Sequence, residues 1–211
     1  MARHLLLIGG ATDRMMERMR ADYEITRLVD QGDLSAFLDA RGADFEAIMT
    51  NGHDGVPKAV MDGLPNLKII ACYGVGYDAI DAEAAARRGI VVTHTPDVLN
   101  DEVANTAILL MLALYRNLLH EDSYVRDGRW LADGNAPLTH SPEHRKVGLL
   151  GMGRIGMRIA EKLQAFQADV SYHSRSPKDV PYGYVGDLVA LAEQVEVLIC
   201  ITPGGPTTAK L

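Results

Sequence analysis

Several features that would assign the chain to a particular class of protein are missing from the sequence. It has no long basic run and carries a formal net charge of −7, which argues against a nucleic-acid partner. Its longest apolar segment, residues 107–115, has about half the length that a transmembrane helix needs. The amino terminus has no signal-peptide cleavage pattern. We therefore expect a soluble, cytoplasmic protein with no membrane partner.

Cysteine is also scarce, with two in 211 residues. Cys72 and Cys200 each end an apolar, strand-like run, so we expect two buried free thiols in a reducing compartment. Neither lies beside a basic cluster, which argues against a catalytic thiol. What is present is ordinary: 47% hydrophobic and 23% charged residues, enough for one large or two small globular domains.

Short apolar runs alternate with helical patterns over the first 97 residues. The pattern predicts strands at 4–9, 23–28, 45–50, 67–73 and 89–94, and helices at 11–20, 34–40 and 82–88. Thr12 or Asp13 can cap the first of these helices and Asp81 the last, which Gly89 can end with a positive φ. Such alternation predicts a parallel sheet with helices on both faces.

The pattern changes near residue 97. Residues 97–128 predict one long helix, capped by Asn100 or Asp101, whose apolar first half should be buried. A polar loop is expected at 131–145. A new unit then follows, with strands at 146–150, 169–173 and 195–201 and helices at 154–165 and near 187–193. The fold class is therefore α/β, with parallel-sheet domains at residues 1–97 and 98–211.

A glycine-rich segment, "VGLLGMGRIGMRIA", joins the strand at 146–150 to the following helix. Gly151 suits a tight turn, Gly153 lets backbone approach a pyrophosphate, and Gly156 lets helix and strand pack closely. The backbone N–H groups of Arg154 and Ile155 would open the helix and face the phosphates. A glycine-rich turn without a ligand is the alternative. The surrounding strand–helix–strand pattern favours dinucleotide binding.

The end of the next strand, "YHSRSPK", bears on the choice of coenzyme. NAD sites place an acidic residue there to accept hydrogen bonds from the ribose hydroxyls, and this segment has none. It offers instead Ser174, Arg175 and Ser176, and an arginine can bind a 2′-phosphate through two hydrogen bonds. A solvated surface arginine is the alternative. The segment favours NADP(H) over NAD(H).

Two earlier strand ends carry glycines as well. In a parallel sheet such ends lie at one edge, where ligands bind, and converging backbone amides there can hold a carboxylate. Asp78 and Asp81 resemble a catalytic pair, but a turn and a helix cap are the roles that their positions favour. The residues expected at this anion site are Asn51, Gly52, Tyr73, Gly74, Val75 and Gly76.

Three motifs in order, "VGYDAID" (75–81), "TPDVL" (95–99) and "GLLGMGRIG" (148–156), resemble the D-isomer-specific 2-hydroxyacid dehydrogenases. Within that family, "SYHSRSPK" and "ITPGGPTTAKL" resemble the NADPH-preferring glyoxylate/hydroxypyruvate reductases and the hydroxyphenylpyruvate reductases. The resemblance implies a flavodoxin-like substrate-binding domain, a Rossmann dinucleotide-binding domain and a substrate cleft between them. It also implies reduction of small 2-oxo acids such as glyoxylate and hydroxypyruvate by hydride transfer from NADPH.

The resemblance further assigns roles to single residues. The backbone of Val75 and Gly76 would hold the substrate carboxylate. The long helix and the arm after it, residues 98–130, would form a homodimer interface, where Trp130 would contact the partner; a buried core tryptophan is an equal alternative. The remaining cofactor contacts implied are Val103 and Thr106 near the nicotinamide, and Thr202, Pro203 and Thr208 near its ribose and phosphate.

Family members use an arginine that binds the 2-oxo acid and a histidine paired with a glutamate, all after the strand that ends near Ile201. We therefore expect a truncated second domain, no catalytic residue in these 211 residues and no turnover by them alone. A non-catalytic nucleotide sensor, like the dehydrogenase-related co-repressors, is the alternative function. The histidines at 53, 94, 140 and 144 suit surface or packing roles, and no metal site is expected.

Overall fold

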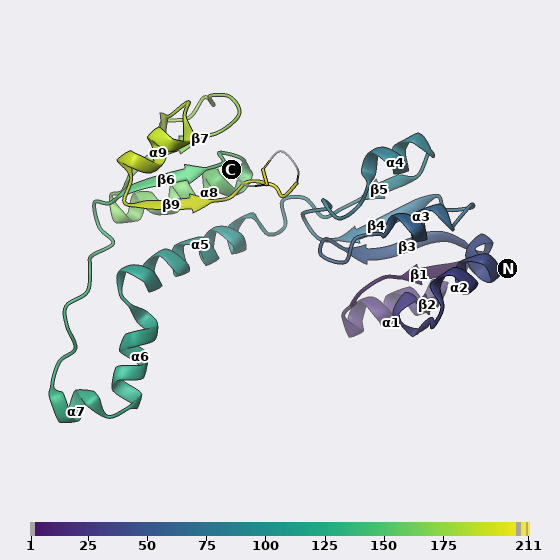
Figure 1. Ribbon diagram of the computed structural model, residues 1–211, viewed down its shortest axis with the longest axis horizontal. Helices are drawn as coiled ribbons and strands as arrows, with labels where there is room; N and C mark the ends of the chain where they lie inside the picture. Colours follow the sequence, from purple (N-terminus) through teal and green to yellow (C-terminus); the bar gives the residue numbers. More distant parts are fainter. Residues whose placement is uncertain (1–2, 206–207, 210) are drawn as a thin grey trace. The chain divides into compact units, whose positions relative to one another are not determined.

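The computed structural model describes residues 3–205, 208, 209 and 211. Contacts within the chain divide it into two compact units, which can be followed by colour in Figure 1. The first comprises Met1–Val98 and Pro203–Leu211, and the second comprises Leu99–Thr202. Each unit has its own parallel sheet and its own hydrophobic core.

The first unit contains a five-stranded sheet in the order β2-β1-β3-β4-β5, and every neighbouring pair is parallel. This order is flavodoxin-like, and its switch point lies between β1 and β3. The strands are β1 (Arg3–Leu7), β2 (Tyr23–Arg27), β3 (Phe45–Asn51), β4 (Ile69–Tyr73) and β5 (Val91–Thr93). The helices are α1 (Asp13–Asp22), α2 (Leu34–Arg41), α3 (Lys58–Asp62) and α4 (Ala82–Arg87), with 3₁₀ turns η1 (Leu28–Asp30) and η2 (Gly42–Asp44).

Helix caps in the first unit follow the sequence closely. The Thr12 hydroxyl accepts from the Met15 amide at 3.3 Å, and the Asp81 carboxylate accepts from the Ala84 amide at 2.8 Å. Gly89 ends the α4 segment with φ +70°. These contacts confirm Thr12 and Asp81 as caps. The core beneath the helices includes Leu6, Ile48 and Ile70, one fully buried residue from each of β1, β3 and β4.

The second unit has a four-stranded parallel sheet in the order β8-β7-β6-β9. With β6 as its first strand, this is the 3-2-1-4 part of the Rossmann order, and the order reverses between β6 and β9. The strands are β6 (Lys146–Leu150), β7 (Asp169–His173), β8 (Gly183–Tyr184) and β9 (Val197–Cys200). The helices include α5 (Asn100–Tyr115), α8 (Arg154–Leu163) and α9 (Leu188–Gln194), with a 3₁₀ turn η3 (Gln164–Phe166).

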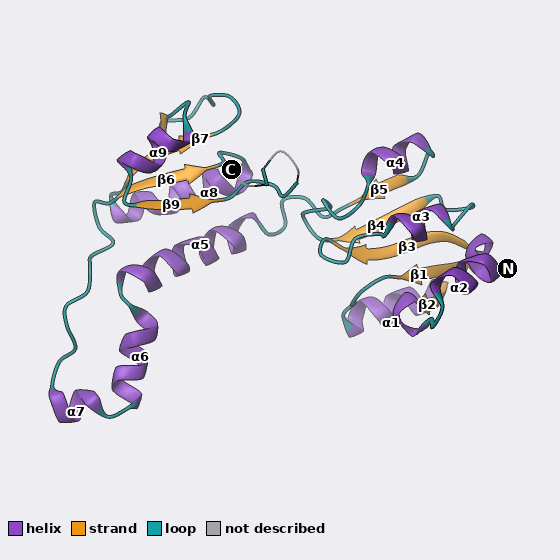
Figure 2. Ribbon diagram, viewed as in Figure 1, coloured by secondary structure: helices purple, strands orange, loops and turns teal. Residues whose placement is uncertain are grey.

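Helices cover both faces of this second sheet, as Figure 2 shows in purple against the orange strands. Leu149 of β6 and Ile159 of α8 share a buried cluster with Met111 of α5. On the opposite face, a methyl group placed on Gly148 would meet Leu191 of α9. The predicted α/β architecture with two parallel sheets is therefore confirmed.

The prediction of one long helix over residues 97–128 is wrong. Two helices lie in this region, α5 and α6 (Leu118–Arg126), and a third, α7 (Arg129–Asp133), begins directly after it. Asn117 separates α5 from α6 with a left-handed backbone conformation, φ 48°, which asparagine adopts more readily than most residues. Gly128 separates α6 from α7 with φ 74°. No side chain caps α5, whose N-cap is Leu99, so the predicted cap at Asn100 or Asp101 is also wrong.

The prediction that the first half of this region is buried is also wrong. In α5 only Ala104 and Met111 are buried, on the stripe that packs against α8. Leu109, Leu110 and Leu114 are 59%, 60% and 77% exposed. An apolar helix is buried only where another element covers it, and α8 covers one stripe of α5.

Other differences have local causes. Cys72 is buried as expected, but Cys200 is exposed because β9 is an edge strand with one uncovered side. The short elements α3 and β8 were not predicted, and α7 extends into the expected loop at 131–145. Segments of two to five residues give too little periodicity to detect.

No single helix among the described residues is long and apolar enough to cross a bilayer. Helices α5 and α6 meet the length and composition requirement only as a pair, with a bend of 61° between them.

Candidate functional site

The glycine turn, defined as residues 151–156, lies at the switch point of the second sheet. Gly151 has φ +111°, and a methyl group on it would stand 2.8 Å from the Ile201 carbonyl oxygen. A methyl group on Gly156 would overlap the Gly151 carbonyl oxygen. A methyl group on Gly153 would meet nothing within 4 Å. Two glycines therefore permit close backbone packing, and the third leaves open space.

Helix α8 begins within this turn, with Gly153 as its N-cap and no capping side chain. By contrast, the Asp187 carboxylate caps α9 through the Ala190 amide at 2.8 Å. The first-turn amides of α8, which include those of Arg154 and Ile155, carry the positive end of the helix dipole. An open turn before an uncapped helix is the arrangement in which backbone amides bind a phosphate.

The start of β9 is fixed to the start of β6 by Glu196. Its carboxylate accepts from the Lys146 amide at 3.0 Å and from the Arg145 guanidinium at 2.7 Å. The Lys146 amide first and the Arg145 guanidinium second hold the pKa of this carboxyl below its usual value. At the other end, the Ile201 amide donates to Leu150 at 2.9 Å. These bonds place β9 beside β6, which creates the switch point.

The selector loop, defined as residues 174–178, follows β7. Ser174 donates through its hydroxyl to the Ser176 carbonyl oxygen at 2.7 Å. Arg175 is exposed and forms no hydrogen bond or ion pair with any residue that the structure describes. The loop contains no acidic residue; Asp179 is the next along the chain. The Arg175 guanidinium is thus available to bind an anion.

The other residues expected to contact the cofactor divide between the two units. Val103 is half-buried on α5, and the exposed Thr106 hydroxyl donates to the Glu102 carbonyl oxygen at 2.9 Å. Thr202 ends the second unit, whereas Pro203 and Thr208 are grouped with the first. The Thr208 hydroxyl donates to Pro203 at 2.6 Å.

In the first unit, three glycines converge where β3 and β4 end side by side. Asn51 and Tyr73 are register partners at the ends of these strands. A methyl group on Gly52 would overlap the Gly76 carbonyl oxygen, and one on Gly74 would lie 3.2 Å from the Gly52 nitrogen. Only glycines allow the two backbones to approach this closely.

The carboxylate nest, defined as residues 74–76, has carbonyl groups that accept hydrogen bonds and two amides that are unpaired among the described residues. Thr95 donates from its amide to Gly74 at 2.9 Å, and His94 Nδ1 lies 2.9 Å from the Val75 carbonyl oxygen. A carbonyl only accepts, so Nδ1 carries the hydrogen. The amides of Val75 and Gly76 find no acceptor among the described residues. Two adjacent unpaired amides suit an anion such as a carboxylate.

Asn51 contributes to this edge indirectly. Its Oδ1 accepts from the amides of His53 and Asp54 at 2.9 and 2.8 Å, and its Nδ2 donates to Asp54 Oδ2 at 2.5 Å. The side chain therefore shapes the loop after β3. Sequence reasoning missed Asp54, although an asparagine at the end of a strand is a signal for a turn in which its side chain bonds the backbone two residues on.

Two histidine–carboxylate pairs occur among the described residues, both away from the ligand edges. His4 lies 3.6 Å from Glu24, near the amino-terminal starts of β1 and β2. His120 lies 3.4 Å from Glu121 on α6. His94 instead packs against Tyr77, with ring centroids 4.8 Å apart. Neither pair is placed for acid–base catalysis at a strand end, and the described residues contain no cluster that could hold a metal.

Comparisons with known proteins agree with this geometry. A hydroxyphenylpyruvate reductase of Plectranthus scutellarioides is 38% identical over 176 residues, 83% of this chain and 56% of that protein. A glyoxylate/hydroxypyruvate reductase of Arabidopsis thaliana is 37% identical over 94% of this chain and 64% of its own length. The chain thus spans less than two thirds of either relative.

The same likeness appears among solved structures. An NADPH-dependent glyoxylate/hydroxypyruvate reductase of Sinorhizobium meliloti, in complex with NADP and malonate, superposes with a TM-score of 0.90 at 42% identity. The match covers 99% of this chain and 65% of that one. The sequence profile of the D-isomer specific 2-hydroxyacid dehydrogenase catalytic domain matches residues 6–208. The chain therefore belongs to the D-isomer specific 2-hydroxyacid dehydrogenase family.

Proposed function

We propose that this chain is part of an enzyme that reduces small 2-oxo acids, such as glyoxylate and hydroxypyruvate, with NADPH. The observation that carries the proposal is the open glycine turn followed by a selector loop with a free arginine and no acidic residue. NADPH, when bound, supplies the hydride that reduces C2 of the acid. The amides of Ile155 and its neighbours bind the pyrophosphate, and Arg175 binds the 2′-phosphate with Ser174 and Ser176.

The substrate is held, in this proposal, by the first unit. The unpaired amides of Val75 and Gly76 bind its carboxylate, and Asn51 shapes the neighbouring loop. Residues 1–97 then form the substrate-binding domain and residues 98–211 the dinucleotide-binding domain. A non-catalytic sensor is not favoured, because the relatives reported above are reductases.

Titration of residues 1–211 with NADPH and NADH tests the coenzyme assignment. We expect tighter binding of NADPH, and Arg175→Ala should weaken it about tenfold or more by removing a charge-assisted bidentate contact. NADH affinity should not change. Arg158→Ala, which removes a surface arginine of α8 paired with Glu161, is the matched control. Tighter binding of NADH than of NADPH would refute the assignment.

We also propose a homodimer that uses residues 98–130. Helices α5–α7 carry a series of exposed apolar side chains, a pattern typical of an interface. They are Leu109, Leu110, Leu114, Leu118, Leu119, Val125 and Trp130. Trp130 is 60% exposed, so the alternative of a buried core tryptophan is wrong. Two free cysteines suit the proposed cytoplasmic location.

Light scattering tests the dimer. Leu110→Glu places a charge on the exposed side of α5 and should convert the dimer to a monomer. Val29→Glu makes the same exchange on the first unit, where Val29 is 74% exposed, and should leave the dimer intact. A monomeric parent chain would contradict the proposal.

A further inference from the structure

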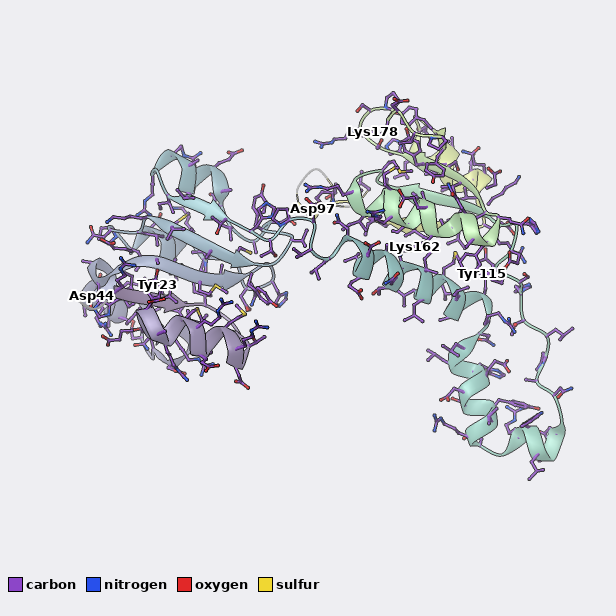
Figure 3. The ribbon with its side chains drawn as sticks, turned by 180° about the vertical axis from the view of Figure 1, so that it is seen from behind. Tyr23, Asp44, Asp97, Tyr115, Lys162 and Lys178 are labelled. Atoms are coloured by element: carbon purple, nitrogen blue, oxygen red, sulfur yellow. The ribbon has the colours of Figure 1, made fainter. Side chains whose placement is uncertain are left out.

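A buried tyrosine hydroxyl fixes one end of the selector loop. Tyr172 of β7 is fully buried, and its hydroxyl accepts from the Lys178 amide at 2.7 Å. The same hydroxyl donates to the Lys178 carbonyl oxygen at 3.3 Å. One side chain therefore bonds both backbone groups of Lys178, which Figure 3 labels on this loop, and the carbonyl oxygen also accepts from the Val180 amide at 3.0 Å. A buried hydroxyl that uses both of its roles on one residue holds that residue firmly in place.

A second tyrosine fixes the other end. Tyr184 of β8 donates through its hydroxyl to the Ser174 carbonyl oxygen at 3.3 Å. Tyr172 and Tyr184 are register partners in the β7–β8 ladder, so their rings project from the same face, with centroids 5.5 Å apart. The two tyrosines thus hold the first and last residues of the selector loop.

Arg175 lies between these two fixed ends. Bidentate recognition of a phosphate depends on where the backbone places the guanidinium, and a loop already ordered before binding loses less conformational entropy on binding. Without the Tyr172 hydroxyl, the Lys178 amide would lack its partner, while the carbonyl oxygen would keep only the Val180 amide at 3.0 Å, and the loop could take other shapes.

We propose that Tyr172 is a positioning residue whose hydroxyl holds the selector loop in the shape that recognises the 2′-phosphate of NADPH. Tyr172 touches no phosphate itself; it acts through the backbone of Lys178. The inference rests on the proposed use of NADPH and adds a residue that determines coenzyme specificity from beneath the binding surface.

Calorimetric titration of residues 1–211 with NADPH and with NADH tests the proposal. Tyr172→Phe keeps the ring and removes only the hydroxyl, and it should raise the Kd for NADPH about tenfold, the factor typical of lost hydrogen bonds. The Kd for NADH should stay within about twofold, since NADH has no 2′-phosphate to place. Tyr184→Phe should raise the Kd for NADPH about threefold, because it removes a single contact.

Tyr182→Phe is the matched control, since the Tyr182 hydroxyl accepts from Gln164 at 2.9 Å and has no bond to the selector loop. It should change neither affinity. An equal loss of NADPH and NADH affinity in Tyr172→Phe would overturn the proposal, as would no loss of either. If Tyr172→Phe does not fold, Tyr184→Phe decides by the same two outcomes. A parent chain that does not prefer NADPH would overturn the proposed coenzyme, and this inference with it.

Discussion

In the first unit, a carboxylate and a capping hydroxyl lie at the turn between the first strand and the first helix, whereas no side chain caps the helix after the corresponding turn of the second unit. Gly9 has φ +77°, and a methyl group on it would overlap the Asp54 carboxylate. Thr12 caps α1. In the second unit, a methyl group on Gly153 would meet nothing within 4 Å, and no side chain caps α8.

Both turns join parallel strands to helices at the ligand edge of a sheet, so topology alone does not distinguish them. The difference lies in which groups satisfy the helix amides and fill the turn. In the first unit the Thr12 hydroxyl occupies one of these amides and the Asp54 carboxylate would repel a phosphate. In the second unit no side chain caps α8, so a phosphate can accept from the first-turn amides. We infer that this contrast assigns the coenzyme to the second unit.

The largest effect is expected when α8 receives a capping side chain like that of α1. In Gly153→Asp, the new carboxylate can accept from the first-turn amides, so the stability of the second unit should hold or rise by a few tenths of a kcal/mol. Coenzyme affinity should fall about hundredfold, because a negative charge occupies the pyrophosphate position. Thermal unfolding and NADPH titration measure the two effects. Gly153→Ala adds bulk without charge and should weaken binding less; unchanged affinity in both variants would refute the assignment.

Gly156→Ala tests the close packing of the glycine turn, whereas the Gly153 variants test the open space in front of it. The new methyl group overlaps the Gly151 carbonyl oxygen, which is backbone and cannot move aside cheaply. We expect the free energy of unfolding of the second unit to fall by about 2 kcal/mol, together with lost coenzyme binding. Urea denaturation checks the first effect. Stability equal to that of the parent chain would show that the contact is not tight.

In the first unit, the ligand edge depends on a buried hydroxyl. Thr50 is 1% exposed, and its hydroxyl donates to the Gly55 carbonyl oxygen at 2.5 Å. Thr50→Val should lower the free energy of unfolding of that unit by about 1–2 kcal/mol, because the carbonyl loses its donor. NADPH affinity should not change. Thr50→Ser keeps the hydroxyl and should retain most of the stability, as urea denaturation would show.

The smallest effect concerns Glu196, which joins β9 to β6. Its pKa is lowered in the folded chain, so its stabilising contribution is present above the unfolded pKa and is lost as the pH falls through the folded one. Glu196→Gln should therefore lower Tm slightly at neutral pH and lose this difference below about pH 4. Glu193→Gln on α9 is the control. A difference that persists in acid would contradict this account.

Local signals in the sequence predicted most of this structure. The caps at Thr12 and Asp81 and the start of α8 each follow from a few neighbouring residues, and the structure has them where predicted. The features that were predicted wrongly depend on packing between elements that are distant in the sequence. The leucines of α5 are exposed because α8 covers one stripe only, and Cys200 is exposed because β9 lies at an edge.

The candidate site shows the same division. Glycine spacing predicted the turn at 151–156, since each glycine has a local task. The closing of the first-unit turn by Asp54 was not predicted, because Asp54 and Gly9 are separated by two strands and two helices along the chain. The support of the selector loop by Tyr172 was missed because a tyrosine within a strand pattern predicts a core residue and nothing more.

Amide chemical shifts of residues 1–211, recorded during titration with NADPH, test the assignment of the coenzyme to the second unit. We expect NADPH to shift the amides of residues 153–156 and of the selector loop, and to leave those of residues 9–12 unchanged. Shifts at residues 9–12 without shifts at 153–156 would contradict it.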